Sequence, residues 1–208
     1  FVTVSDANGC TSTSATMITS PTALTNTLVS STNVSCNGGN NGAITIVAGG
    51  GTPGYTHSWT PHARSGPTAT GLVAGGYTVT VTDQNGCSTP LTVTISEPGA
   101  ITLSTITNPS TCGNSNGFVS VSPAGGTPGF TYLWDDPLNQ TTAIASSLPA
   151  GIYNVVVTDL NGCTATTAVL LTDIFGPSIG TISYSEPSCN GASNGTATVV
   201  PTGGTPLY

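Results

Sequence analysis

The sequence contains very few charged side chains. Only 4% of its 208 residues are charged, lysine is absent, and Arg64 is the only certain cation. Nucleic-acid binding is therefore excluded, because contacts to phosphate require clusters of Lys and Arg. The net charge of -7 comes from scattered acidic residues, so the sequence predicts no acidic tail and no trap for polyvalent cations.

Long apolar runs are missing as well. No run of eighteen apolar residues occurs, so we expect no membrane insertion. Hydrophobic residues nevertheless make up 37% of the chain, and with 27 glycines they reach the share found in ordinary globular domains. The chain should therefore fold. Because no stretch shows helical spacing with a cap, we expect the fold to consist of strands.

One five-residue motif recurs along the chain. Asp-x-Asn-Gly-Cys stands at Asp6–Cys10, Asp83–Cys87 and Asp159–Cys163, in steps of 77 and 76 residues. A second series of cysteines advances by 76 and 77 residues, which makes the whole chain an array of one repeated unit. The cysteines of this second series are Cys36, Cys112 and Cys189.

The repeat boundaries are expected near Pro21, Pro98 and Asp173. Residues 1–21 are then the C-terminal part of a repeat, residues 22–98 and 99–173 are two complete repeats, and residues 174–208 are the N-terminal part of a further repeat. Since both ends fall inside a repeat, we expect the sequence to be a window from a longer array.

Within one unit, apolar residues alternate with polar ones, and they do so at the same places in each copy. Ile44 and Ile46 share one face, as do Tyr77, Val79 and Val81. Six or seven short strands with a buried Trp on the third describe a small immunoglobulin-like sandwich, so the predicted fold is an all-β tandem array of such sandwiches, each of about 76 residues. The predicted core aromatics are Tyr55, Trp59, Tyr77, Phe130, Trp134 and Tyr153.

The Asp-x-Asn-Gly part of the motif predicts a tight hairpin turn. Asn-Gly tolerates positive φ, and Asp caps its own turn by accepting a hydrogen bond from the backbone. These residues also resemble the start of a calcium loop, but the later acidic ligand is missing, so a plain turn is favoured. The predicted turn residues are Asp83, Asn85, Gly86, Asp159, Asn161 and Gly162.

The six cysteines stand alone, without Cys-x-x-Cys pairs, which favours disulfides over zinc and indicates an exported protein. Three kinds of pairing are open: within a unit, across a linker, and between neighbouring units. In an ordinary immunoglobulin topology the first and last hairpins lie at opposite ends. That arrangement counts against the first two pairings and permits contact such as Cys36 with Cys163.

No catalytic or metal-ligating set recurs. His57 alternates with aromatic residues and is interpreted as a packed histidine, and His62 as part of a variable loop. No general base recurs beside a serine, so we expect no enzyme. We also expect no cofactor, although Asp135 and Asp136 could add a weak, exposed calcium site.

Several longer stretches, taken together, resemble the SprB repeat, which occurs in large surface adhesins of gliding Bacteroidetes. The resemblance implies export by the type IX secretion route, display on the cell surface as filaments, and adhesion to surfaces or polysaccharide; the family offers no catalytic residues. The stretches are Cys-Asn-Gly-Gly-Asn-Asn-Gly at Cys36, Gly-Gly-Thr-Pro-Gly-Tyr at Gly50, Trp59, Ala74-Gly-Gly-Tyr77 and Thr82-Asp-Gln-Asn-Gly-Cys87.

The sequence thus predicts the structural repeat region of a secreted bacterial cell-surface adhesin or extracellular filament. Edge strands are usually protected by charged side chains, and this chain has few, so we expect identical chains to associate in a filament or bundle. The alternative is an array of carbohydrate-binding immunoglobulin-like modules, in which exposed Tyr and Trp stack on surface polysaccharide. Because the aromatics share strand faces in register, core positions are favoured.

Overall fold

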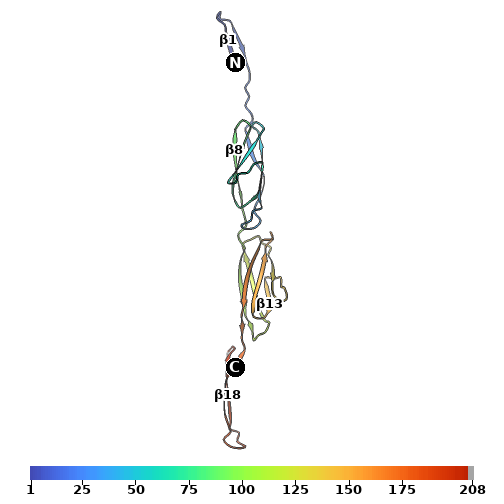
Figure 1. The fold of residues 1–208 in the computed structure, drawn as a ribbon, viewed down its shortest axis with the longest axis vertical. Helices are drawn as coiled ribbons and strands as arrows, with labels where there is room; N and C mark the ends of the chain where they lie inside the picture. The colour runs from blue at the N-terminus through green and yellow to red at the C-terminus, as the bar shows by residue number, and fades with distance from the viewer. Residues whose placement is uncertain (206–208) are drawn as a thin grey trace. The chain divides into compact units, whose positions relative to one another are not determined.

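The computed structural model describes residues 1–205; residues 206–208, at the end of the predicted segment 174–208, lie outside it. All regular structure in residues 1–205 is β-strand. Within this range no helix has the length and apolar character to cross a bilayer. The chain forms two units (Figure 1): unit 1 comprises residues 1–34 and 38–97, and unit 2 comprises residues 35–37 and 98–208.

Unit 1 contains a sandwich of six antiparallel strands in two sheets, with the orders β3-β4-β6 and β5-β7-β8. Numbered A, B, C, E, F and G along the chain, these sheets are A-B-E and C-F-G, which is the immunoglobulin arrangement without its D strand. The strands are β3 (Thr25–Thr32), β4 (Gly42–Gly49), β5 (Thr56–Thr60), β6 (Thr68–Leu72), β7 (Gly75–Thr82) and β8 (Ser88–Ile95).

Unit 2 repeats this sandwich, with the sheet orders β9-β11-β13 and β12-β14-β15. A short parallel pair, β10 with β16, is added to it. The strands are β9 (Thr102–Asn108), β10 (Ser110–Thr111), β11 (Gly117–Ala124), β12 (Thr131–Trp134), β13 (Ile144–Leu148), β14 (Gly151–Thr158), β15 (Thr164–Leu171) and β16 (Asp173–Ile174).

Each unit also carries a separate two-stranded hairpin. In unit 1 it joins β1 (Val2–Ser5) to β2 (Thr11–Ser14), and in unit 2 it joins β17 (Pro177–Ser185) to β18 (Thr196–Gly203). These hairpins carry the outer copies of the repeated motifs.

The two cores form because alternate residues of each strand face inward. Ile44 and Val79 are fully buried in unit 1, as are their counterparts Val119 and Val155 in unit 2. In each core, one Trp from the third strand of the sandwich lies opposite a valine of the neighbouring strand in the same sheet. Trp59 on β5 lies opposite Val79 on β7, and Trp134 on β12 lies opposite Val155 on β14. The prediction of an all-β array of immunoglobulin-like sandwiches is confirmed.

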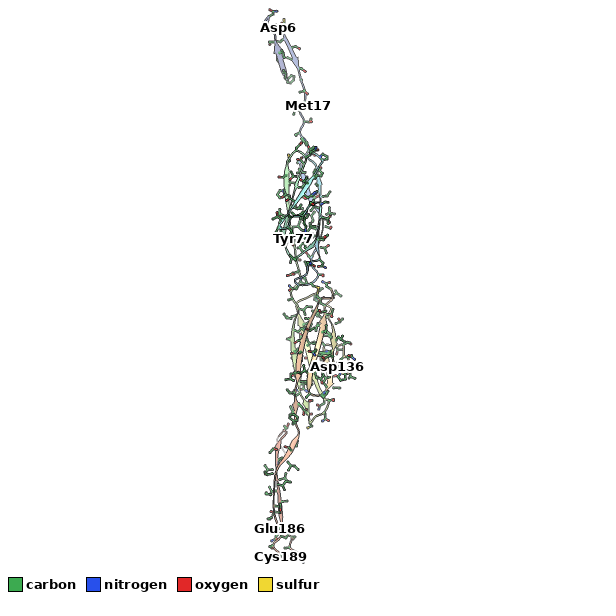
Figure 2. All side chains as sticks on the ribbon, viewed as in Figure 1. Asp6, Met17, Tyr77, Asp136, Glu186 and Cys189 are labelled. Carbon is green, nitrogen blue, oxygen red and sulfur yellow. A yellow bond between two sulfur atoms is a disulfide. The ribbon has the colours of Figure 1, made fainter. Side chains whose placement is uncertain are left out.

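A tyrosine near the start of the F strand ties each sandwich together. The hydroxyl of Tyr77 donates to the carbonyl of Val73 (3.0 Å), and that of Tyr153 donates to the carbonyl of Pro149 (2.8 Å). This contact is the tyrosine corner of immunoglobulin domains. Tyr77 is labelled in Figure 2.

The structure also explains the recurring Gly-Gly-Thr-Pro motif. Gly50 has a φ of 66°, and a Cβ atom built on it would lie 2.0 Å from the carbonyl oxygen of Ala23. In the next copy, a Cβ on Gly125 would lie 2.0 Å from the carbonyl oxygen of Ala100. Any side chain here would collide with the segment that enters the first strand, so both positions require glycine.

Candidate functional site

The Asp-x-Asn-Gly-Cys motif forms the turn between the F and G strands of each sandwich. In unit 2, Asp159 Oδ1 accepts hydrogen bonds from the backbone N–H groups of Asn161 (2.9 Å) and Cys163 (2.8 Å). Its other oxygen accepts from the Thr127 N–H at 2.8 Å. Gly162 has a φ of 83°, which closes the turn. The buried carboxylate thus fixes the direction in which the turn presents the cysteine.

Unit 1 contains the same turn. Asp83 accepts from the backbone N–H groups of Asn85 (3.0 Å), Cys87 (2.9 Å) and Thr52 (2.9 Å), and Gly86 has a φ of 84°. The residues chosen from the sequence as turn residues therefore lie in two equivalent turns.

A disulfide joins Cys36 to Cys163, which are 127 positions apart in sequence and have their Cα atoms 5.6 Å apart. Cys36 belongs to the segment Ser35–Asn37, which is part of unit 2 although its neighbours on both sides belong to unit 1. This is the pairing that an ordinary immunoglobulin topology permits. The remaining cysteines, Cys10, Cys87, Cys112 and Cys189, are exposed thiols.

A carboxylate from the end of the repeat holds the loop that carries the second cysteine series. In unit 2, Asp173 accepts hydrogen bonds from the Ser110 hydroxyl (2.7 Å) and the Gly113 N–H (3.1 Å). In unit 1, Glu97 accepts from the Gly38 N–H at 2.7 Å. The role of neither acidic residue is evident from the sequence; the signal that could have found them is an acid at or next to the repeat boundaries near Pro98 and Asp173.

Backbone donors stabilise the charged form of the buried turn aspartates. The Thr52 N–H, followed by those of Cys87 and Asn85, lowers the pKa of Asp83 against the opposing effect of burial. The Thr127 N–H has the same effect on the pKa of Asp159. Both carboxylates are therefore ionised in the folded protein across the physiological pH range.

These pKa shifts predict acid sensitivity. A carboxyl whose pKa is lower in the folded than in the unfolded state stabilises the fold at pH values above its unfolded-state pKa of about 3.9. This stabilisation is lost as the pH falls through the folded-state pKa. We expect the melting temperature to stay level between pH 7 and 5 and to fall below pH 4, as measured by circular dichroism. The variant Asp159→Asn should have a lower melting temperature than the parent at pH 7, and its melting temperature should fall less steeply below pH 4. A parent melting temperature that rises below pH 4 would contradict this.

The predicted core aromatics all lie in or against the two cores. Trp59 and Trp134 are 3% and 1% exposed, and their indole N–H groups donate to the carbonyls of Gly66 (3.0 Å) and Thr142 (2.9 Å). Tyr77 and Tyr153 are buried, whereas Tyr55 and Phe130 are half-buried and pack against the cores.

The other candidate residues are held by local contacts. His57 is half-buried on β5, and the ring of His62 lies 6.1 Å from that of Tyr77. Asp136, labelled in Figure 2, accepts from the backbone N–H groups of Leu138 and Gln140, and Asp135 accepts from Asn154. Within residues 1–205, no group of three His, Cys, Asp or Glu side chains is placed to hold a metal ion.

Burial and donors act in opposite directions on these loop carboxylates. Burial, the strongest influence, raises the pKa of Asp136, but donation from Gln140 and Leu138 leaves that pKa below its ordinary value. The Asn154 side chain and backbone lower the pKa of Asp135. Burial, together with these two negative charges, raises the pKa of Tyr153.

Among solved structures, the chain is similar to the three N-terminal domains of the bacteriophage RB49 Highly Immunogenic Outer Capsid protein, at 14% identity and a TM-score of 0.47, covering 88% of this chain and 71% of that one. It is also similar to the N-terminal eight Ig domains of Down Syndrome Cell Adhesion Molecule isoform 1.30.30, at 14% identity and a TM-score of 0.41, covering 86% and 27% of the two chains. Sidekick-1 immunoglobulin domains 1–5 show 11% identity and a TM-score of 0.38, covering 86% and 45%.

No curated protein matches the chain in sequence. The sequence pattern of the SprB repeat family, in contrast, matches three stretches, residues 28–63, 104–139 and 181–208. Each match begins in the first strand of a repeat and includes the loop that carries Cys36, Cys112 or Cys189. The chain is therefore a tandem array of SprB repeats.

Proposed function

We propose that the chain is a structural repeat region of a secreted bacterial cell-surface adhesin or extracellular filament, where it provides reach and surface attachment. The observation that carries the proposal is the disulfide between Cys36 and Cys163, which links the cysteine loop of one sequence repeat to the turn of the next. A protein whose job is to extend over a distance gains from covalent links between successive repeats.

The disulfide also supports a location outside the cytoplasm. Disulfides persist in oxidising compartments and are rare where thiols are kept reduced. The match to the SprB repeat points in the same direction, since that repeat occurs in large surface adhesins. Export by the type IX route and a role in gliding belong to this proposal as well.

The role is proposed to be non-enzymatic. The turn aspartates that recur in both units, Asp83 and Asp159, hold turns, with each carboxylate oxygen accepting from backbone N–H groups. A carboxylate bound in this way is fixed in its charged form and is poorly suited to exchange protons with a substrate.

The carbohydrate-binding alternative depends on exposed aromatic faces. Trp59 and Trp134, the only tryptophans in the sequence, are buried with their indole N–H groups bonded to backbone carbonyls. They therefore offer no flat surface for a sugar ring. The buried aromatics favour the structural role, and polysaccharide would then be bound by another part of the adhesin.

Antibodies against the 208-residue chain test the proposal directly. Immunogold labelling of intact, unpermeabilised cells that express the native protein should decorate the cell surface or filaments that extend from it. Antibodies against a cytoplasmic protein serve as the control and should label only permeabilised cells. Labelling that appears only after permeabilisation would refute the proposed location.

The proposed role needs no metal ion. The oxygens of Asp83, Asp135, Asp136 and Asp159 accept from N–H donors, and these bonds compete with cation binding. We expect the melting temperature to change by less than about 2 °C when calcium is added or removed with a chelator, because a ligand that does not bind the folded state cannot stabilise it. A calcium-dependent rise in the melting temperature would contradict this.

A further inference from the structure

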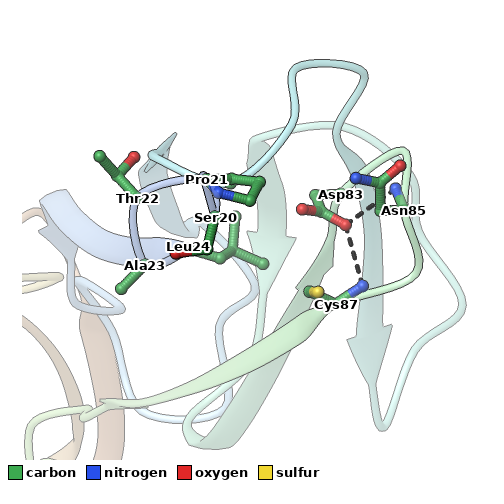
Figure 3. Close-up of a pocket in the computed structure, with 9 residues that line it drawn as sticks. Ser20, Pro21, Thr22, Ala23, Leu24, Asp83, Asn85 and Cys87 are labelled. Carbon is green, nitrogen blue, oxygen red and sulfur yellow. Dashed lines mark hydrogen bonds between the residues drawn. The ribbon is translucent and has the colours of Figure 1, made fainter. Parts of the chain in front are cut away.

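Three carboxylates are buried in residues 1–205, those of Asp83, Asp136 and Asp159. Asp83 and Asp159 hold the two F–G turns. Figure 3 shows the hydrogen bonds that Asp83 accepts from the backbone N–H groups of Asn85 and Cys87. Asp136 lies in a different place, in the loop between β12 and β13, and is only 2% exposed. Burying a charge is unfavourable unless the charge is hydrogen-bonded, so the partners of Asp136 indicate its role.

Asp136 orients the side chain of Gln140. One carboxylate oxygen accepts from the Gln140 backbone N–H at 2.8 Å, and the other accepts from the side-chain Nε2 at 3.0 Å. The same Nε2 also donates to the carbonyl of Ser146 at 2.9 Å, and Gln140 Oε1 accepts from the Ser146 N–H at 3.0 Å. Both ends of the amide are therefore bonded to the backbone of one residue, as the backbone of a neighbouring strand would be.

Ser146 lies on a strand that has no neighbour on one side. β13, labelled in Figure 1, is the last strand of the sheet β9-β11-β13, and no strand in residues 1–205 pairs with its outer side. The Val121 N–H of β11 donates to the carbonyl of Ala143. Since the backbone groups of successive strand residues point to alternate sides, those of Ser146, three positions further on, point away from β11. In the immunoglobulin arrangement this side belongs to the D strand, which is absent here.

Unit 1 covers the equivalent position with a different side chain. The guanidinium of Arg64 donates to the carbonyl of Thr70 on β6, which is the last strand of the sheet β3-β4-β6. Thr70 and Ser146 are 76 positions apart, which is one repeat. Arg64 and Gln140 each stand six positions before the residue that they contact. The same backbone carbonyl is thus covered in both units, by a guanidinium in one and by an amide in the other.

An uncovered strand edge pairs readily with another strand, and proteins usually block it with charged side chains or proline. β13 reads Ile-Ala-Ser-Ser-Leu and β6 reads Thr-Ala-Thr-Gly-Leu, so neither strand contains a charge or a proline. We infer that Gln140 and Arg64 are edge-blocking residues, which prevent β13 and β6 from pairing with the same strand of a second copy of this chain.

An identical copy is the partner that fits an opened edge. Antiparallel pairing of a strand with itself is symmetric, so each N–H and C=O group of one copy meets its complement in the other. Chains displayed side by side in a filament would be close enough to pair in this way. With both edges blocked, identical chains associate through other surfaces, and the sandwiches stay separate.

Replacing Gln140 by alanine should open the edge of β13 and make the purified chain associate. The exposed thiols are alkylated first, so that new disulfides cannot join two copies. We expect the self-association constant in sedimentation equilibrium to rise roughly tenfold, because each copy gains an unpaired donor and acceptor that the other copy can satisfy. The matched control is Gln84→Ala, the same substitution at the only other glutamine, which is exposed in unit 1 and should behave as the parent. A folded Gln140→Ala protein that associates no more than the parent would overturn the inference.

Two further variants separate an open edge from a loosened fold. Gln140→Glu removes the same donor to Ser146 but places a negative charge at the edge, and such a charge keeps strands from pairing. We therefore expect Gln140→Glu to associate no more than the parent. In the double variant Gln140→Ala with Ile144→Lys, a lysine replaces an exposed side chain of β13 and should restore the parent behaviour. Association that persists in either variant would show that another surface is responsible.

Unit 1 provides an independent test of the same idea. Arg64→Ala should raise self-association by a similar factor through β6, whereas Arg64→Lys, which keeps a charged donor near Thr70, should not. Arg64 is exposed, so its removal should leave the fold intact, as circular dichroism will show. A folded Arg64→Ala protein that associates no more than the parent would contradict the inference even if unit 2 does not tolerate the loss of Gln140. Surface labelling of cells does not depend on self-association, so failure here leaves the proposed function standing.

Discussion

Breaking the disulfide by Cys36→Ser should lengthen the fully stretched chain by roughly 400–450 Å in a single-molecule pulling experiment. With handles at the two ends, force in the oxidised protein passes from Cys36 directly to Cys163 through the sulfur bond. The residues between these two cysteines, which are 127 positions apart, carry no tension, so most strands of both sandwiches cannot be pulled out. Without the bond, each of these residues adds about 3.4 Å of length.

The control for this experiment is Cys112→Ser, which removes an exposed thiol that takes part in no disulfide. It should extend to the same length as the parent chain, and reduction of the parent should reproduce the Cys36→Ser result. Equal lengths for oxidised parent and Cys36→Ser would show that the bond does not form. The change should also lower the free energy of unfolding, by about 2 to 5 kcal/mol, because a long closed loop loses its constraint in the unfolded state.

Replacing Trp134 by alanine should unfold unit 2 at a much lower temperature than unit 1. The side chain is 1% exposed at the end of β12, and its removal leaves a large cavity and an unpaired carbonyl on Thr142. Such substitutions cost about 3–5 kcal/mol. For a domain of this size the cost corresponds to a drop of roughly 15–30 °C in melting temperature, measurable by calorimetry.

Leu133→Ala is the matched control, because this neighbour lies on the opposite strand face and is 53% exposed. Its cost should stay below about 1 kcal/mol. In the Trp134→Ala protein, Trp59 becomes the only tryptophan and its fluorescence reports on unit 1, which should melt as in the parent. If Trp134→Ala left the fold intact and abolished binding to a polysaccharide, the carbohydrate-binding interpretation would replace the structural one.

The sequence predicted the strands because inward and outward residues alternate and because each copy repeats the pattern. Trp59 and Trp134 could be assigned to the core from their shared face with other aromatics, and the turns at Asp83 and Asp159 from the tolerance of Asn-Gly for positive φ. These are local properties, which depend on residues only a few positions apart.

Contacts between distant residues could not be predicted in the same way. The partner of Cys36 depends on which end of a sandwich each turn occupies, and the sequence left three kinds of pairing open. The hydrogen bonds that Glu97 and Asp173 accept from the cysteine loops also join segments about 60 residues apart. A lone acidic residue near a proline or glycine resembles any surface residue until the chain is folded.

Arg64 gives the bond between Cys36 and Cys163 a further consequence. This exposed residue follows β5, in the loop before β6, and lies between the two bonded cysteines in the sequence. A protease that cleaves the loop at this basic site would cut the polypeptide backbone. The two fragments would nevertheless stay joined by the disulfide. Cleavage at this site would therefore not release the part of the protein that lies beyond it.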